Sequence, residues 1–167
     1  LKSFCEGARA LEQVADADVI ASGMPLLLTH LADVAKDTGH YESALRLLSR
    51  SIDQATEKRQ ADVYLESLLT MARCCQALGR LSDAKRQLEQ AVVLAGFLFE
   101  DQNRLGIAKA MLAEIKLALG EIEAAKELAR SAVRISHRVG GPRGIALASL
   151  AMAEIGIATG NFMDARD

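Results

Sequence analysis

Residues 32–44 read ADVAKDTGHYESA, and this pattern of residue types recurs three more times along the chain. The later copies are ARCCQALGRLSDA (72–84), AEIKLALGEIEAA (113–125) and AEIGIATGNFMDA (153–165). Every copy begins and ends with alanine, has a glycine at its eighth place and a large apolar residue two places later. The glycines, at 39, 79, 120 and 160, lie 40, 41 and 40 residues apart. Such a period indicates one supersecondary unit copied along an axis.

The residues between the glycines follow helical spacing, with apolar side chains recurring every three or four places. Each glycine is expected to end one helix, because glycine adopts the left-handed conformation without a Cβ penalty. Pro25 falls where a helix should begin, and Gly140-Gly141-Pro142 is the clearest breaker between repeats. The recurrent alanines would let the helix axes of a hairpin approach closely. We predict first helices at about 24–38, 62–78, 103–119 and 143–159, and second helices at about 41–57, 81–98 and 122–138.

The 167 residues are long enough for one domain, here a single helical-repeat domain over 1–167. We predict repeats at 21–60, 61–101 and 102–141, the end of a preceding repeat in 1–20, and a truncated repeat at 142–167. The chain begins at Leu1 and ends inside a repeating unit, so we expect a fragment of a longer protein. Apolar side chains at the cut ends, Phe162 among them, would favour self-association.

The helix-turn-helix unit resembles the tetratricopeptide repeat. The matching positions are the small first-helix residues, the glycine turns and the second-helix alanines: Ala32, Ala72, Ala113, Gly39, Gly79, Gly120, Ala44, Ala84 and Ala125. The resemblance implies an all-α fold, a right-handed α-α superhelix (solenoid) of antiparallel helix hairpins. The period exceeds the usual 34 residues, and the proline that commonly closes each repeat is absent. In both respects the chain is similar to the helical repeat domains of large bacterial transcriptional and signalling regulators.

The overall composition argues against several partners. A formal net charge of −2 gives no electrostatic attraction to nucleic acid or anionic membrane. No apolar run reaches the roughly 18 residues that a membrane span needs, and the N-terminus lacks a signal-peptide pattern. We therefore expect a soluble, cytoplasmic protein. Among the three cysteines, Cys74 and Cys75 are adjacent, and we interpret them as small buried apolar residues, with a strained vicinal disulfide as the alternative.

The sequence offers little for catalysis. Residues 140–144, GGPRG, lack the Gly-Lys-Ser/Thr ending of a phosphate loop and follow no strand, so they are interpreted as a turn. His30, His40 and His137 lie in different repeats without ligand spacing around them. No nucleophile, base and orienting residue are brought together by the pattern. We expect no enzyme activity, no catalytic residue, no metal and no cofactor.

Two sets of residues are candidates for partner binding. Proteins of this family usually present their first helices on the concave side, and the residues six and ten places before each glycine would face that groove. The candidates there are Thr29, Asp33, Leu69, Arg73, Glu114, Leu150 and Glu154. They lack the Lys, Asn and Arg lining of carboxylate-clamp members, and suit an amphipathic helix or another part of the same polypeptide. The second set is a basic stripe on one helix, Lys126, Arg130, Arg134 and Arg138, which is either an anion or acidic-partner contact or a solvated face.

The function that follows is a protein-protein interaction or regulatory scaffold, part of a larger bacterial regulator, that binds a protein or peptide. The alternative is an effector-sensing domain of a multidomain ATPase-type transcriptional regulator or signalling protein.

Overall fold

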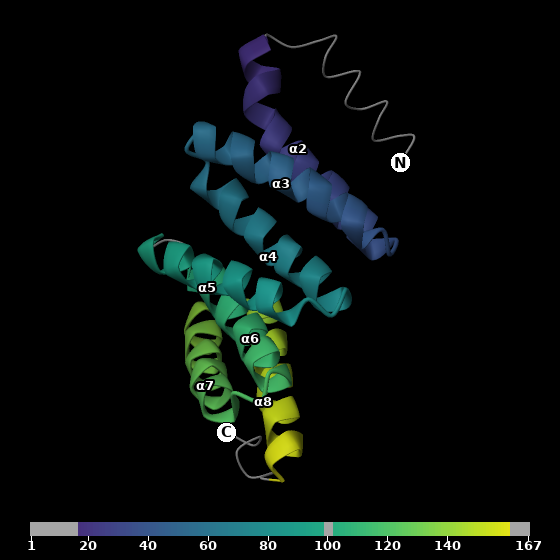
Figure 1. Ribbon diagram of the computed structural model, residues 1–167. Coiled ribbons are helices and arrows are strands. Elements are labelled where there is room, and N and C mark those ends of the chain that lie inside the picture. The colour runs from purple at the N-terminus through teal and green to yellow at the C-terminus, as the bar shows by residue number, and fades with distance from the viewer. Residues whose placement is uncertain (1–16, 99–101, 161–167) are drawn as a thin grey trace. The chain divides into compact units, whose positions relative to one another are not determined.

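The computed structural model describes residues 17–98 and 102–160, and all regular secondary structure in them is helical (Figure 1). The helices of these residues are α2 (Ala17–Asp37), α3 (Tyr41–Glu57), α4 (Ala61–Ala77), α5 (Leu81–Phe97), α6 (Gln102–Ala118), α7 (Ile122–Val139) and α8 (Pro142–Thr159). From α3 onward, each begins and ends within one residue of the predicted bounds. The all-α prediction is confirmed for the described residues.

The four repeating glycines adopt the left-handed conformation, with φ of 79°, 71°, 79° and 67° in chain order. After the first three, the next residue donates its backbone N–H to the carbonyl five places earlier, at 2.8 Å each time. This Schellman arrangement satisfies a carbonyl that the helix end would otherwise leave unpaired. The glycines therefore act as helix ends, as the sequence predicted. Arg59 makes the same turn after α3 with φ of 57°, the one non-glycine residue of the described chain with positive φ.

The first described helix corrects the prediction. Helix α2 begins at Ala17 instead of near residue 24, so it includes residues that we had assigned to a preceding repeat, and Pro25 lies inside it. An internal proline removes one helix hydrogen bond and crowds the preceding turn. Here the Pro25 carbonyl accepts hydrogen bonds from the side chains of Thr29 and Ser51, at 3.0 and 2.6 Å. These buried bonds stabilise the chain around the proline. The second helix predicted to end within 2–15 lies outside the described residues.

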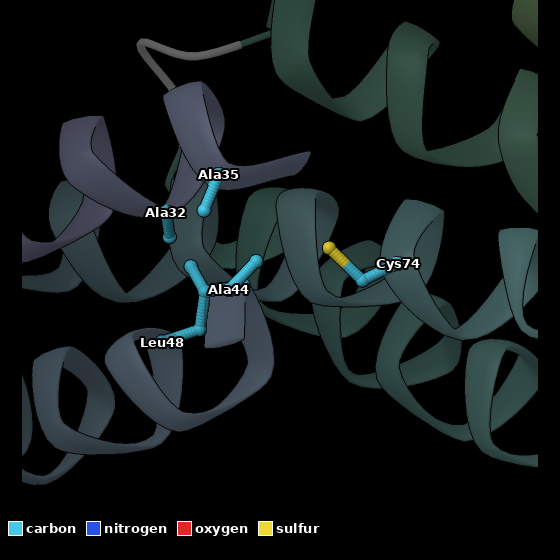
Figure 2. Packing of buried hydrophobic residues seen from close by; sticks show 5 residues of the cluster. All are labelled: Ala32, Ala35, Ala44, Leu48 and Cys74. Carbon is cyan, nitrogen blue, oxygen red and sulfur yellow. The ribbon is translucent and has the colours of Figure 1, made fainter. Parts of the chain in front are cut away.

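Contacts divide the chain into two compact units, up to Cys74 and from Cys75 onward, with the division inside α4. In the first unit α2 packs against α3. Buried residues of α2, α3 and α4 form one cluster, which Figure 2 labels: Ala32, Ala35, Ala44, Leu48 and Cys74. The predicted repeat boundaries within a single domain remain a prediction.

In the second unit α6 packs against α5, α7 and α8, and α7 also packs against α8. Alanines again dominate the core, in one cluster with Ile155 and in a second of Ala110, Ala132 and Ala148. Six of the repeating alanines are at most 1% exposed, namely Ala32, Ala44, Ala72, Ala84, Ala113 and Ala125, whereas Ala153 of α8 is half-buried. Methyl groups at these places let helices approach closely, so their burial was predictable.

Helices α6, α7 and α8 of the second unit pack closely around Ser136 of α7. A Cβ atom added to Gly106 of α6 or Gly144 of α8 would lie 2.8 or 2.9 Å from the Ser136 Oγ. Only glycine fits at both places without displacing the serine. Both the Ser136 Oγ and the nearby Asn103 Oδ1 are buried and have no hydrogen-bond partner within the described chain.

Candidate functional site

The first-helix candidates of the first unit are not all at the surface. Thr29 and Leu69 are 0% and 5% exposed. The expectation that the residue ten places before each glycine faces a groove is therefore wrong for these two positions. Asp33 and Arg73 are half-buried and can still reach a partner.

Thr29 is buried because it belongs to a hydroxyl cluster joining α2, α3 and α4. Its Oγ1 lies 2.9 Å from the Ser51 Oγ and 2.8 Å from the Ser67 Oγ, and the two serine oxygens are 3.2 Å apart. Hydrogen bonding of this kind offsets the cost of burying hydroxyl groups. The corresponding places of later repeats hold apolar residues or alanine, which was the signal available in the sequence.

The Asp33 side chain already forms hydrogen bonds with neighbours in its own unit. Its Oδ1 accepts hydrogen bonds from the Lys36 Nζ at 2.8 Å and the Thr70 Oγ1 at 3.2 Å. Burial opposes the charge on Lys36, but the hydrogen bonds and attraction of Asp33 and Asp37 prevail, so the pKa of Lys36 is raised. Asp33 thus has a structural role beside any role in binding.

The candidates of the second unit are more accessible. Glu114 on α6 is half-buried, whereas Leu150 and Glu154 on α8 are exposed. Leu150 is 50% exposed on the last described helix, whereas its counterparts in the earlier repeats are buried, Thr29 and Ala110 of them against later helices. Those counterparts are Thr29, Leu69 and Ala110. Ile157 lies on the same face of α8, seven residues after Leu150, and is 69% exposed. Helix α8 therefore presents an apolar face with an acidic residue at its centre.

The basic stripe lies on the outer face of α7, opposite its buried alanines. Lys126 is half-buried and forms an ion pair with Glu123 at 3.1 Å. The three arginines are exposed. The Arg138 Nη2 donates to the Gln102 Oε1 at 3.1 Å, which connects the end of α7 to the start of α6. The charge of the stripe is therefore concentrated toward the end of the helix.

A second charged group, which the sequence analysis did not single out, surrounds the turn between α6 and α7. Glu121 accepts hydrogen bonds from the Lys116 Nζ at 2.6 Å and the Lys85 Nζ at 2.5 Å. Hydrogen bonds to Lys116 and Lys85 lower the pKa of Glu121, and the bond to Glu121 raises the pKa of Lys85. This cluster connects three helices of the second unit, and its residues lie up to 36 positions apart. No local spacing in the sequence announces it.

The adjacent cysteines and the glycine-rich segment occupy structural places within the described residues. Cys74 and Cys75 are buried thiols outside any disulfide, as the apolar interpretation predicted. Gly140 ends α7 with φ of 75°, and Pro142 begins α8, so the glycine-rich segment is a turn. Over 17–98 and 102–160, no group of three or more His, Cys, Asp or Glu could hold a metal ion. In the same residues no helix is long and apolar enough to cross a membrane.

Comparisons with known proteins identify the family. The model of the tetratricopeptide repeat matches residues 23–95, and a second model of the same description matches residues 107–131. The chain is a tetratricopeptide-like repeat protein. No curated protein matches its sequence.

Solved structures share the fold. The crystal structure of BtubC (BKLC) from P. vanneervenii has a TM-score of 0.77 and 18% identity, covering 98% of this chain and 65% of that one. The structure of "kinesin light chain nearly identical TPR-like repeats" from Podosopora anserina has a TM-score of 0.69 and 19% identity, covering 98% and 79%. A Signal Transduction ATPase with Numerous Domains with a tetratricopeptide repeat sensor, from Pyrococcus horikoshii, has a TM-score of 0.75 and 18% identity. The match covers 98% of this chain but 25% of the ATPase. These likenesses place the chain in the all-α superhelical repeat class.

Proposed function

We propose that this chain is a non-catalytic scaffold that binds a protein or peptide, as tetratricopeptide repeats generally do. The observation that carries the proposal is the repeat itself, which the family models match over 23–95 and 107–131. An array of helix pairs offers extended surface for a partner and little enclosed space for chemistry. The partner can be a separate protein or another domain of the same polypeptide, in a cytoplasmic setting.

Within the first-helix set, we propose that Leu150 and Glu154 are the principal contacts. Both are exposed on α8, and an exposed leucine beside a carboxylate suits an amphipathic helix that carries basic residues. Arg73 and Glu114 are half-buried and would contribute less. Asp33 would also contribute less, because it already bonds to Lys36 and Thr70.

The test is a pull-down from the source cell, followed by direct titration of the identified protein. The double variant Leu150→Ala/Glu154→Lys should lose about tenfold or more in affinity, because it removes an apolar anchor and reverses a charge. A matched control is Ser49→Ala/Asp53→Lys, at exposed places on α3. Equal affinity of wild type and the α8 variant would show that Leu150 and Glu154 are not the principal contacts.

A second function has a specific observation in its favour. The fold matches an ATPase whose description includes a tetratricopeptide repeat sensor, and the match covers 25% of that protein. This chain would then be the effector-sensing part of a larger transcriptional or signalling regulator. A nucleotide-binding motif in the flanking sequence of the parent gene would support this alternative. If the flanking sequence lacks such a motif, the scaffold function is favoured.

A further inference from the structure

Equivalent outward-facing places on the second helices carry three different kinds of side chain. The places lie 14 and 18 residues after each repeating glycine. They hold acidic residues in α3, apolar residues in α5 and arginines in α7: Asp53 and Glu57, Val93 and Phe97, Arg134 and Arg138. All six residues are exposed. Because the places are equivalent, the repeat architecture does not itself require these differences.

Packing within the described chain does not account for the apolar pair on α5, because both side chains are exposed. Val93 and Phe97 are 60% and 74% exposed, and they lie one turn apart on the same face. The buried face of α5 consists of other residues: Ala84, Leu88, Ala91 and Ala95. An exposed phenylalanine with an apolar neighbour is typical of an interface anchor, since aromatic side chains supply much of the binding energy at interfaces.

The arginines of α7 lie in the same compact unit as this apolar pair. Helices α5 and α7 both pack against α6 (Figure 1). The bond from Arg138 to Gln102 holds the end of α7 at the start of α6. Gln102 follows Phe97 by five residues, a stretch that spans at most about 18 Å. The apolar pair and the arginines can therefore contact one helical ligand together.

We propose that the outer face of α5 and α7 is a second docking surface, independent of the first-helix set, that binds an acidic amphipathic helix of a partner protein. The apolar side of such a helix would cover Val93 and Phe97, and its carboxylates would pair with Arg134 and Arg138. Charge complementarity selects this ligand. Nucleic acid fits less well, because phosphate binding needs a broad basic surface, and the chain has a net charge of −2.

The probe is a synthetic helical peptide of about 18 residues, with leucine at i, i+3, i+4 and i+7 and glutamate flanking them. A twin peptide carries lysine in place of every glutamate. In the Leu150→Ala/Glu154→Lys variant, which lacks the α8 face proposed for basic helices, fluorescence anisotropy should show binding of the acidic peptide and little binding of its twin. Phe97→Ala should weaken the affinity about thirtyfold, as loss of an interface anchor does. Arg134→Glu should weaken it about tenfold or more, with a smaller effect at high salt.

Two controls separate this surface from the proposed function and from a change of fold. Asp53→Lys on α3 and Leu150→Ala/Glu154→Lys on α8 should bind the acidic peptide as wild type does. Circular dichroism should be the same for every variant, because the altered side chains are exposed.

Three results would overturn the proposal. One is equal binding of the two peptides by the Leu150→Ala/Glu154→Lys variant, and another is full binding of the acidic peptide by the Phe97→Ala and Arg134→Glu variants. The third is tighter binding of single-stranded DNA or phosphatidylserine vesicles than of the acidic peptide, with loss in the same variants. None of these results bears on binding at α8, which the Leu150 and Glu154 variant tests separately.

Discussion

Ser51 in the first unit and Ser136 in the second are buried where helices meet, and they differ in hydrogen bonding. Ser51 bonds to the Pro25 carbonyl at 2.6 Å and lies within hydrogen-bonding distance of Thr29 and Ser67. The Ser136 Oγ has no partner within the described chain and lies against two glycines. A buried hydroxyl without a partner costs free energy, whereas a bonded one contributes stability. The earlier repeats hold alanine at the place of Ser136, namely Ala55 and Ala95.

We therefore expect opposite effects from the same substitution. Ser136→Ala should raise the free energy of unfolding by about 1 kcal/mol, because it removes an unpaired hydroxyl. Ser51→Ala should lower it by about 1–2 kcal/mol, because it removes bonds within a buried cluster. Urea denaturation of both variants beside wild type measures the difference. Equal destabilisation by the two substitutions would show that the Ser136 hydroxyl is bonded in solution.

At the scale of a helix, the repeating alanines set how closely neighbouring helices approach. Ala84 of α5 is 0% exposed, so a larger side chain there has no space. Ala84→Leu should lower the free energy of unfolding by roughly 1–3 kcal/mol through overpacking. Ala77→Leu at the exposed end of α4 is the control, since leucine and alanine have similar helix propensities. An unchanged thermal midpoint for Ala84→Leu would show that this position tolerates a large side chain.

The Glu121 cluster should make the stability of the second unit depend on pH. Hydrogen bonds to Lys116 and Lys85 lower the pKa of Glu121 below its ordinary value of 4.5. A lowered pKa means that the contribution of Glu121 to stability is present above pH 4.5 and is lost as the pH falls through the folded-state pKa. Its two lysine partners connect α5, α6 and the turn before α7.

The variant Glu121→Gln keeps the size of the side chain and removes its charge. It should be less stable than wild type at pH 7, and the difference should shrink as the pH falls below 4.5. Lys85 has a raised pKa, so its share of the stability should be lost at alkaline pH, above its ordinary value of 10.5. Urea denaturation midpoints of wild type and Glu121→Gln, measured from pH 2 to pH 8, show how this difference in stability changes at acid pH. If the difference in stability stays constant over this range, the pKa of Glu121 is not lowered by Lys85 and Lys116 in the folded protein.

For the whole molecule, the repeat made most of the fold predictable. The glycines and alanines have local roles, because a left-handed turn needs glycine and a close helix approach needs a methyl group. The remaining features depend on residues far apart in the sequence. Thr29 is buried in a hydroxyl cluster with Ser51 and Ser67, which lie 22 and 38 positions away in the sequence. Likewise, Pro25 is accommodated inside α2 beside this cluster. Spacing within one repeat does not reveal such pairs.

The proposed docking surface on the second helices was likewise only partly predictable from the sequence. The arginine stripe is visible in the sequence as a four-residue spacing, but the exposed Val93 and Phe97 differ little from core residues there. Only their burial pattern separates them, because α5 turns its alanines and Leu88 inward. The apolar half of the proposed docking surface therefore could not be identified from the sequence alone.

Whole molecules should associate through the exposed apolar face of α8. Leu150 and Ile157 are 50% and 69% exposed on one face, and the counterparts of Leu150 in earlier repeats are buried. An exposed apolar face of this kind favours burial against a second copy. Phe162, which we also expected at this surface, lies outside the described residues.

Light scattering after size-exclusion chromatography tests this association directly. Wild type should show an average mass above that of the monomer, and the excess should grow with concentration from about 10 to 500 μM, as mass action requires. Ile157→Lys should return the mass to that of the monomer, because it places a charge on the face that would be buried. Val93→Lys on α5 is the matched control, since it adds the same charge at an exposed apolar place that this association does not use. A strictly monomeric wild type at the highest concentration would exclude self-association and leave the α8 face to a different protein. Loss of association in Val93→Lys instead of Ile157→Lys would place the contact between copies on the second helices.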